Sequence, residues 1–258
     1  MRALVTGGAK RIGREMAIYL AERGYDVAIH YNESKKEAEA LTSEISALGR
    51  CASALHADLL DENQVTGLVS KASSALGGPL TILINNASIF EFDTVQTATR
   101  KNWDRHIESN LRAPFVMTQE FAQQAPLAGR DSNGELIATS LIVNLLDQRV
   151  RKLTPEFSTY SIAKMGLWAL TTISAQGLAP KIRVNAIGPG PTLQGSRQSD
   201  FHFSLQRSNT ILQRGANASD INAALGYFLD SHAVTGQLLC VDGGQHLCWQ
   251  TPDVLGVE

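Results

Sequence analysis

The stretch R-A-L-V-T-G-G-A-K-R-I-G, residues 2–13, carries the strongest indication of the fold. Four residues suited to a buried strand are followed by a glycine-rich turn, T-G-G-A-K-R-I-G, which leads into the first predicted helix. Such a turn lets backbone N–H groups approach a pyrophosphate at the positive end of a helix. Many strand–helix turns contain glycine for conformational reasons alone, so the motif by itself is weak. At the first strand–helix junction it favours a dinucleotide-binding fold.

Short β-branched runs alternate with longer amphipathic ones along the whole chain. Apolar strands that are each followed by a helix indicate a parallel sheet covered on both faces, and right-handed crossovers make it doubly wound. We therefore predict one α/β domain over residues 1–258, a Rossmann fold with a seven-stranded parallel sheet and helices on both faces. The expected strands are 3–6, 26–30, 51–57, 81–85, 141–146, 182–186 and 237–241. Helical spacing of apolar residues covers 12–23, 34–48, 61–76, 100–124, 157–178 and 219–229.

Three segments do not fit the alternation. Residues 126–135 contain Pro, Gly, Asp and Asn and predict a surface loop. Residues 189–203 contain two prolines and two glycines and are candidates for a substrate flap. The C-terminal tail, residues 245–258, extends past the last strand, and Trp249 is expected to pack either on a neighbouring subunit or on its own.

Composition excludes several classes of protein. Hydrophobic residues make up 43% and charged residues 19% of the chain, as in soluble globular domains. A net charge of −2 without a block of like charges argues against a nucleic-acid partner or an anionic membrane surface. Three cysteines without C-x-x-C argue against a disulfide framework and against a metal site. The chain starts directly with a strand and has no apolar run long enough to cross a bilayer, so we expect a cytoplasmic protein.

The end of the second strand bears on cofactor choice. NAD-binding folds usually place an acidic residue about 20 residues after the glycine turn, on the ribose 2′-hydroxyl. Here the tip reads I-H-Y-N-E-S, with His30 and Tyr31 at the strand end and Glu33 already in the turn. Arg11, His30 and Ser34 offer donors and positive charge to a 2′-phosphate, which predicts NADPH. The alternative is that Arg11 is a solvated helix residue and His30 a packed strand end.

Tyr160 and Lys164 are the main candidates for chemistry. They lie four residues apart on a predicted helix and therefore share a face. A phenol has a pKa of about 10, and a nearby ammonium favours the phenolate and lowers that pKa. A lone Y-x-x-x-K is common by chance on surface helices. Here it follows the glycine turn, N-N-A-S (85–88) and Asn110, and it precedes P-G-P (189–191).

In this order the motifs resemble those of the short-chain dehydrogenases/reductases, and the resemblance extends over nearly the whole chain to V-D-G-G (241–244). It implies a homotetramer and a catalytic set of Asn110, Tyr160 and Lys164, the lysine also holding the cofactor ribose. Asp58 resembles the adenine-contacting aspartate of that family, although a helix N-cap is an equally good interpretation. The implied cofactor-binding residues are Gly7, Arg11, Ile12, Gly13, His30, Tyr31, Ser34, Asp58, Leu59, Asn86, Ala87, Ser88, Tyr160, Lys164, Pro189 and Gly190.

Asp147 departs from the usual family pattern. Most members carry a serine about thirteen residues before the tyrosine, and here that residue is Asp147, in N-L-L-D-Q-R (144–149). Ser140 lies seven residues too early to replace it. An aspartate at this position resembles the pteridine reductases and their dihydromonapterin and dihydrofolate reductase relatives. Three further stretches resemble that branch: A-K-R-I-G with Arg11, H-Y-N-E-S, and N-N-A-S-I-F. The last of these implies that Phe90 stacks on the pterin.

The residues therefore predict an NADPH-dependent reductase of a C=N bond in a pterin or dihydrofolate-like ring. Reduction of C=N needs a proton on nitrogen, which Asp147 can relay to Tyr160 when burial keeps its carboxyl partly neutral. The expected substrate contacts are Arg11, Ser88, Phe90, Asp147 and Tyr160. A keto reductase of the same fold and a non-catalytic dinucleotide-binding scaffold are the alternatives. The basic run at 149–152 either binds an acidic tail, such as the glutamate of a folate, or is a solvated loop.

Overall fold

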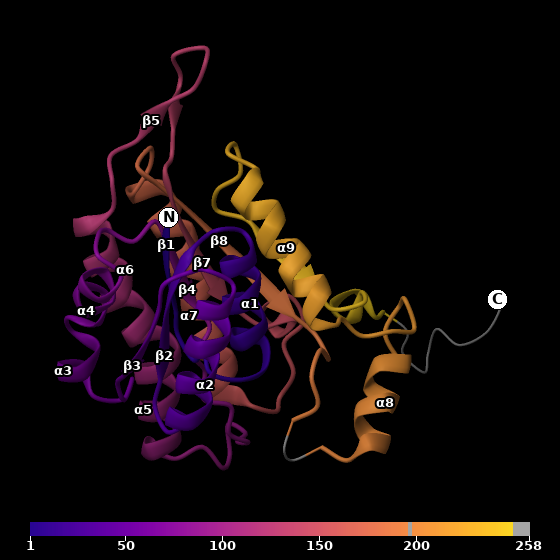
Figure 1. Cartoon of the computed structure of the whole chain (residues 1–258). Helices are drawn as coiled ribbons and strands as arrows, with labels where there is room; N and C mark the ends of the chain where they lie inside the picture. Colours follow the sequence, from indigo (N-terminus) through magenta and orange to yellow (C-terminus); the bar gives the residue numbers. More distant parts are fainter. Residues whose placement is uncertain (196–197, 250–258) are drawn as a thin grey trace.

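A seven-stranded, entirely parallel sheet forms the centre of the computed structural model, which describes residues 1–195 and 198–249 (Figure 1). The strand order is β3-β2-β1-β4-β7-β8-β9. This confirms the predicted doubly wound sheet. The strands are β1 (Arg2–Val5), β2 (Asp26–Tyr31), β3 (Ala52–His56), β4 (Ile82–Asn85), β7 (Ser140–Leu145), β8 (Ile182–Pro189) and β9 (Leu238–Val241).

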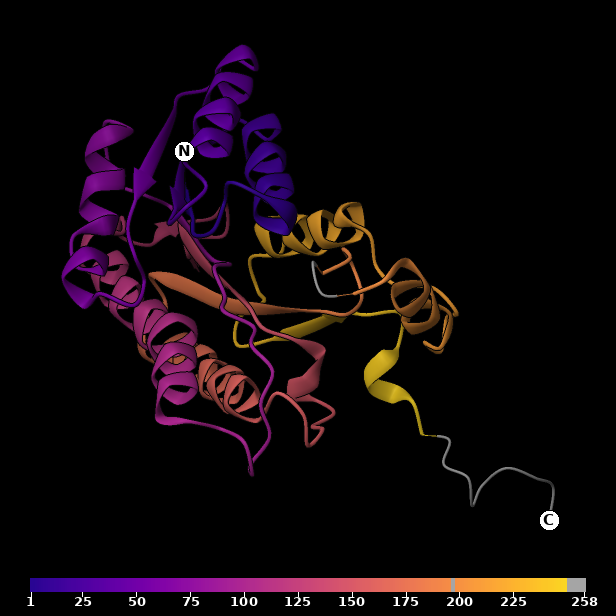
Figure 2. The same ribbon diagram turned by 90° about the horizontal axis from the view of Figure 1, so that it is seen from below.

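Helices cover both faces of this sheet (Figure 2). Successive side chains of a strand point to opposite sides, so each face needs its own cover. Val5 and Ile84 belong to the core under α1 (Arg11–Glu22), α2 (Lys35–Ala47) and α9 (Ala218–Asp230). Their neighbours Leu4 and Leu83 belong to the opposite core. That core packs against α3 (Glu62–Val65), α4 (Leu68–Ala75), α6 (Ala113–Gln124) and α7 (Ser158–Gly177).

The chain changes direction across the sheet between β1 and β4. From β1 it winds outward through β2 to β3, and it then returns to place β4 on the other side of β1. Ligands of doubly wound sheets bind at this switch point, beyond the carboxyl ends of the strands. Here the Thr6 hydroxyl accepts hydrogen bonds from the backbone N–H groups of Asn86 and Ala87, at 2.9 and 3.0 Å. These bonds join the two turns that follow β1 and β4.

Two predicted helices are interrupted. Residues 61–76 form α3 and α4, which separate at Gly67, where φ is +84°. Asp61 caps α3 by accepting from Asn63 N at 3.0 Å. Residues 100–124 form α5 (Arg100–Ile107), the π-helical turn η1 (Glu108–Arg112) and α6. A π turn of this kind often marks a functional site, and η1 contains Asn110.

The predicted irregular segments contain short elements that the sequence did not indicate. Within and after 126–135, β5 (Gly129–Arg130) pairs antiparallel with β6 (Leu136–Ile137), closed by a turn in which Gly134 has φ +79°. From the end of 189–203 onward, the chain forms α8 (Asp200–Ser208), whose N-cap is Ser199, and the Ser199 hydroxyl accepts from His202 N at 3.2 Å. Figure 1 shows α8 standing away from the sheet.

The two remaining short helical turns are η2 (Gln148–Val150) and η3 (Gln245–Leu247). The part of the predicted tail at 250–258 lies outside the described residues, and Trp249 before it is 65% exposed. Among the described residues, no helix combines the length and the apolar character needed to cross a membrane.

Candidate active site

Tyr160 and Asp147 form a hydrogen-bonded pair at the carboxyl edge of the sheet. Asp147 follows β7 by two residues, and Tyr160 lies in the first turn of α7. The Tyr160 hydroxyl donates to Asp147 Oδ2 at 3.0 Å. The interval of thirteen residues predicted this juxtaposition, and the structure contains it. A carboxylate therefore stands next to the phenol.

Asp147 is held by its own turn. Its side-chain Oδ1 accepts from Arg149 N at 2.8 Å and caps η2. Burial raises the pKa of the Asp147 carboxyl, and the Arg149 N–H, the Arg149 charge and the Tyr160 hydrogen bond act in the opposite direction. The two oxygens of Asp147 therefore have different partners, since Oδ1 caps η2 and Oδ2 accepts from Tyr160.

The electrostatics of Tyr160 differ from the expectation that Lys164 would bring its pKa down. Burial, followed by the charge of Asp147 and its hydrogen bond, raises the pKa of Tyr160 well above 10. A hydrogen bond with the Ser88 side chain acts against this rise. Lys164 Nζ lies 5.7 Å from the Tyr160 ring centroid and donates to Leu145 O at 2.7 Å, not to the phenol. Tyr160 is consequently a neutral phenol with a proton to donate.

Lys164 is almost fully buried, with 2% of its surface exposed. Burial lowers its pKa from 10.5 to about 8, although the Asp147 charge acts in the other direction. The ammonium is therefore close to its titration range near neutral pH.

Asn110 contacts the backbone of the segment that follows β4. Its amide Oδ1 accepts from Ile89 N at 2.8 Å, and its Nδ2 donates to Ile89 O at 2.9 Å. Asn110 is fully buried in the π turn η1, where the wider helical turn presents its side chain to Ile89. In this structure its side-chain hydrogen bonds hold the segment next to Ser88.

Phe90 belongs to an aromatic cluster beside the hydrogen-bonded pair of Tyr160 and Asp147. It is 42% exposed, and its ring meets the Tyr160 ring edge-on, with centroids 4.7 Å apart. One face of Phe90 stacks on Phe157 at 4.2 Å and an interplanar angle of 11°. The Arg149 guanidinium lies 4.9 Å from the Phe157 centroid. A flat, partly exposed apolar surface thus adjoins the phenol.

The other two cations of the basic run at 149–152 have contacts within the chain. The Arg151 guanidinium lies 5.6 Å from the Trp168 ring centroid. Lys152 Nζ donates to Cys248 O at 2.9 Å, which ties this loop to the segment after β9. Arg149 is the cation of the run that lies against the aromatic cluster.

Two glycines of the turn, Gly7 and Gly13, leave no room for a side chain. Gly7 has φ +58°, and a Cβ on Gly13 would lie 2.3 Å from Gly7 O and 2.5 Å from Asn86 Nδ2. Asn86 Nδ2 donates to Thr6 O at 2.8 Å and to Gly7 O at 3.1 Å, so it fixes the turn from the β4 side. Ala87 lies within 3.2 Å of a Cβ on Gly7. The turn therefore brings backbone to the start of α1, with Ile12 in its first helical turn, as a pyrophosphate site requires.

Arg11 joins this turn to the predicted flap. It starts α1 with φ +56°, which is uncommon for a residue with a side chain. Its guanidinium donates to Gln194 O at 2.7 Å and to Leu193 O at 2.9 Å. The side chain is exposed, and it crosses the space between the phosphate turn and the segment that follows β8.

His30 does not supply the positive charge that we expected of it. It is 2% exposed, its Nδ1 accepts from Gly7 N at 3.1 Å, and its Nε2 faces Ala57 O at 3.0 Å. Burial lowers its pKa from 6.5 to about 4, so the ring is neutral. The packed strand end, which was the alternative, is the correct interpretation.

Other residues near the end of β2 keep polar groups at the surface. Tyr31 is partly exposed and packs against His56 at 5.5 Å between ring centroids. Ser34 precedes α2 without using its hydroxyl as a cap. A cleft of about 430 Å³ lies beside the glycine turn. It is lined by Ala9, Lys10, Arg11, Arg14, Glu37, Ala40, Leu41 and Glu44.

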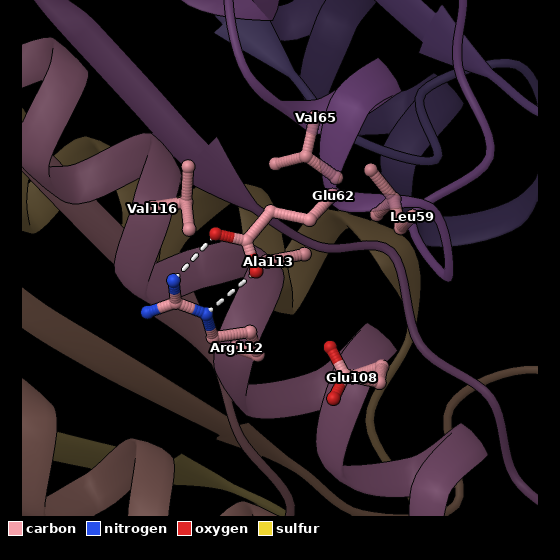
Figure 3. Close-up of a pocket in the computed structure, with 7 residues that line it drawn as sticks. All are labelled: Leu59, Glu62, Val65, Glu108, Arg112, Ala113 and Val116. Atoms are coloured by element: carbon pink, nitrogen blue, oxygen red, sulfur yellow. Dashed lines mark hydrogen bonds and ion pairs between the residues drawn. The ribbon is translucent and has the colours of Figure 1, made fainter.

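Asp58 and Leu59 follow β3. Asp58 Oδ1 accepts from Leu60 N at 3.0 Å, whereas the N-cap of α3 is Asp61, so Asp58 is not that cap. The Leu59 side chain lies in the core and borders a small hollow at the surface of α3 and α6 (Figure 3). In this hollow Arg112 binds both Glu62 oxygens, at 3.0 and 2.5 Å. Only the backbone of Leu59 is therefore available to a ligand at the sheet edge.

Pro189 ends β8 at the same edge, and Gly190 follows it. Gly190 N donates to Val241 O at 3.0 Å, and a Cβ on Gly190 would lie 2.5 Å from Asp242 Cβ. Because Asp242 lies so close, only glycine fits at position 190. The same contact directs the segment after β8 over the site. Within the described ranges, no group of three or more His, Cys, Asp or Glu side chains is arranged to hold a metal ion.

Sequence reasoning missed several residues that the fold brings to this site. Phe157 lies behind Phe90, and His106 meets the Tyr160 ring edge-on at 6.0 Å. Asp93 and Thr159 are buried next to His106. The alternation in I-F-E-F-D, residues 89–93, was the available signal, because phenylalanine alternates there with residues that face inward.

Comparison with known proteins agrees with this architecture. A family model described as short chain dehydrogenase matches residues 1–203. The crystal structure of FolM alternative dihydrofolate reductase 1 from Brucella suis in complex with NADP has a TM-score of 0.90 and 42% identity, covering 98% of each chain. Its counterpart from Brucella canis complexed with NADP has a TM-score of 0.89 and 41% identity, covering 99% of this chain and 98% of that one.

A third similar protein is named for a different substrate. The 3-oxoacyl-(acyl-carrier-protein) reductase FabG of Staphylococcus aureus strain Mu50 is 32% identical over 250 residues, which is 95% of this chain and 98% of that protein. The family match spans most of the chain, including the glycine turn, Tyr160 and Lys164. The chain therefore belongs to the short-chain dehydrogenase family.

Proposed function

We propose that this protein is an NADPH-dependent reductase of a C=N bond in a pterin or dihydrofolate-like ring. One observation carries the proposal, the 3.0 Å hydrogen bond from the Tyr160 hydroxyl to Asp147 beside the partly exposed ring of Phe90. A phenol backed by a carboxyl can supply a proton to a ring nitrogen and recover it. The aromatic surface gives a flat heterocycle a place to stack.

The residues of the glycine turn fit a dinucleotide. Gly7 and Gly13 leave backbone exposed where a side chain would collide, and Asn86 fixes that shape. Bound NADPH supplies the hydride. We assign Arg11 and the hydroxyl of Ser34 to the 2′-phosphate. His30 instead supports the glycine turn, because its ring lies between Gly7 N and Ala57 O. Lys10 is an additional candidate, although it pairs with Glu37 at 2.7 Å.

In the proposed reaction Tyr160 donates its proton to the substrate nitrogen. Asp147 then returns a proton to the phenolate and regains one from solvent, and burial, which raises the pKa of its carboxyl, favours the protonated form that this step needs. Lys164 is close enough to stabilise negative charge at the site and has no contact with the phenol hydroxyl. Its proposed role is to hold the cofactor ribose.

Similarity to known proteins supports the same substrate class. The two FolM structures are 41% and 42% identical to this chain, whereas FabG is 32% identical. Both FolM proteins are named alternative dihydrofolate reductase 1, and both structures contain NADP. We extend both to this chain as a proposal.

A keto reductase is the second candidate, because FabG matches 95% of the chain. Against it, the position beside Tyr160 that bears a serine in most of the family holds Asp147 here. A non-catalytic scaffold is disfavoured by the assembled pair of Tyr160 and Asp147 and by the buried Lys164.

We further propose that the protein acts in the cytoplasm as a homotetramer. Helices α6 and α7 expose large apolar side chains that suit contacts between subunits. These are Phe115, Ile162, Met165 and Ile173, with 38%, 48%, 37% and 64% of their surface exposed. Sedimentation equilibrium of the purified chain tests the assembly, and a monomer would contradict it.

Asp147→Ser tests the role of the aspartate. Turnover of a dihydropterin should fall by about 100-fold, since a general acid–base contribution of that order is lost, with KM for NADPH unchanged. Ser140→Ala, at the other end of β7, is the matched control and should leave turnover within about twofold, as is usual for changes away from a site. An unchanged rate in Asp147→Ser would remove the reason for assigning this substrate class.

A further inference from the structure

Residues 89–93 form an extended strap that alternates between two environments. Phe90 and Phe92 point outward, with 42% and 56% of their surface exposed. Ile89 and Glu91, which alternate with them, are partly buried, and Asp93 is 2% exposed. Extended backbone places alternate side chains on opposite sides. The strap therefore directs its two phenylalanines toward the site, and Ile89, Glu91 and Asp93 toward the interior of the protein.

Each inward residue of the strap is bound to a neighbouring helix. Asn110 binds both backbone groups of Ile89, at 2.8 and 2.9 Å. Glu91 N donates to His106 Nε2 at 3.1 Å, and the Glu91 carboxylate pairs with Arg105 at 2.9 Å. Two of these anchors, Arg105 and His106, lie in the last turn of α5.

A buried chain of hydrogen bonds continues from His106 to Asp93. Because Glu91 donates to Nε2, the His106 proton lies on Nδ1, which donates to the Thr159 hydroxyl at 2.7 Å. The Thr159 hydroxyl in turn donates to Asp93 Oδ2. Asp93 Oδ1 accepts from Thr159 N at 3.2 Å. All three side chains are at most 3% exposed, so the chain of bonds is shielded from water.

Asp93 also fixes the residue before α7. Its carbonyl accepts from Phe157 N at 2.7 Å. Phe157 has φ +57° and ψ +47°, a left-handed conformation that a residue with a bulky side chain rarely adopts and that persists only when its surroundings determine it. In this conformation its ring stacks on Phe90 at 4.2 Å and meets the Phe92 ring edge-on at 5.3 Å.

We propose that Asp93, Thr159 and His106 are positioning residues that hold Phe157 in its left-handed conformation, so that its ring supports Phe90 as the stacking surface for a flat heterocyclic substrate. This inference rests on the proposed function. The same bonds join the strap to the turn that bears Tyr160, one residue after Thr159. Substrate surface and proton donor are thereby kept in a fixed relation.

Thr159→Val removes both hydrogen bonds of the hydroxyl with little change in volume, and Thr159→Ser retains them. Loss of an ordered stacking surface should raise KM for a dihydropterin about tenfold, the equivalent of one aromatic contact. The KM for NADPH should stay unchanged, and Thr159→Ser should restore the wild-type KM. Equal rises in both KM values, or no rise in either, would overturn the inference.

Phe157→Leu keeps an apolar side chain and all the hydrogen bonds to Asp93, so it serves if the valine variant does not fold. It should raise KM for the dihydropterin in the same way, and an unchanged KM would contradict the role of the ring.

Amide hydrogen exchange separates this inference from the proposed function. The N–H of Phe157 and of Thr159 should exchange faster in Asp93→Asn and Thr159→Val than in wild type and Thr159→Ser. If they do, while the wild-type protein ignores dihydropterins, the bonds hold the turn as inferred and the proposed substrate is wrong. Unchanged exchange in both variants would overturn the positioning role whatever the substrate.

Discussion

Asp147 differs from a serine hydroxyl in two properties that matter next to Tyr160. It can be charged or neutral, and it offers two oxygens, of which one caps η2 and the other accepts from the phenol. A serine in its place would orient a carbonyl but would not hold a titratable proton. The residue thus links a local turn to the Tyr160 hydroxyl, and its charge adds to the burial that raises the pKa of Tyr160.

The proximity of Asp147 and Tyr160 could be predicted from the sequence, because Asp147 follows β7 and Tyr160 lies in the first turn of α7. The protonation states of Tyr160 and Lys164 could not be predicted from the sequence in the same way. It depends on burial, which raises the pKa of Tyr160 and lowers that of Lys164, and on the 5.7 Å that separates Lys164 Nζ from the phenol ring. His30 shows the same limit, since only the fold reveals that both ring nitrogens are used.

Lys164 predicts an upper limit to the pH range of activity. Because burial lowers its pKa to about 8, the ammonium is present below this pH and is lost above it. The kcat/KM for NADPH, which reports the free enzyme, should therefore fall about tenfold per pH unit above pH 8. A pH profile from 6 to 10 checks this, with Lys164→Met as the variant in which the step disappears. A wild-type profile that is flat to pH 10 would contradict it.

Arg11 predicts the choice of cofactor. Arg11→Gly removes the guanidinium while glycine tolerates the observed φ of +56°. The KM for NADPH should rise about tenfold or more, as expected for loss of a charge-assisted phosphate contact, and that for NADH about threefold at most. Arg14→Gly on the same helix is the control, because Arg14 pairs with Glu15 and Glu44 instead. Equal losses with both cofactors would show that Arg11 does not bind the 2′-phosphate.

The first strand, its turn and α1 form the element that was most predictable. Its glycines are required by contacts that any such turn must make, as the 2.3 Å approach at Gly13 shows. The strap, η1 and α8 were less accessible. A single π turn leaves no periodic signature within 100–124, and the strap is ordered by partners from α5, η1 and α7 that are distant in sequence.

Gly13→Ala tests the packing of this element. The new Cβ would collide with Gly7 O and Asn86 Nδ2, so the protein should lose about 1–3 kcal/mol of stability and bind NADPH more weakly. Denaturant unfolding and NADPH titration check both effects. Gly177→Ala at the end of α7, where nothing lies within 4 Å, is the control and should be neutral or stabilising by up to about 1 kcal/mol. Full NADPH affinity in Gly13→Ala would place the dinucleotide elsewhere.

The layered architecture of the molecule follows from strands in which successive apolar side chains point to opposite faces of the sheet. Leu4 and Val5, or Leu83 and Ile84, enter different cores, and each core needs its own layer of helices. This is why the seven-stranded doubly wound sheet could be predicted from the sequence. The same arrangement brings the turns after β1, β4, β7 and β8 to one edge, where Gly7, Asn86, Asp147 and Gly190 lie.

Acid should destabilise the protein through His30, which is buried at the centre of this edge. Its pKa is about 4 in the folded protein against an ordinary 6.5, so the unfolded chain binds more protons as the pH falls between these values. The free energy of unfolding should therefore drop by about 3 kcal/mol between pH 7 and pH 4 from this group alone. Denaturant unfolding of wild type and His30→Gln at both pH values isolates the contribution, and identical pH dependence in the two would refute it.

The substrate class itself is tested by one comparison of kcat/KM under saturating NADPH, between a dihydropterin or dihydrofolate and a 3-oxoacyl thioester. The arrangement of Asp147, Tyr160 and Phe90 predicts that the heterocycle is preferred by about 100-fold or more, because a site built for one set of hydrogen bonds rejects a substrate that cannot make them. A preference of that size for the 3-oxoacyl thioester would contradict the account and identify a keto reductase.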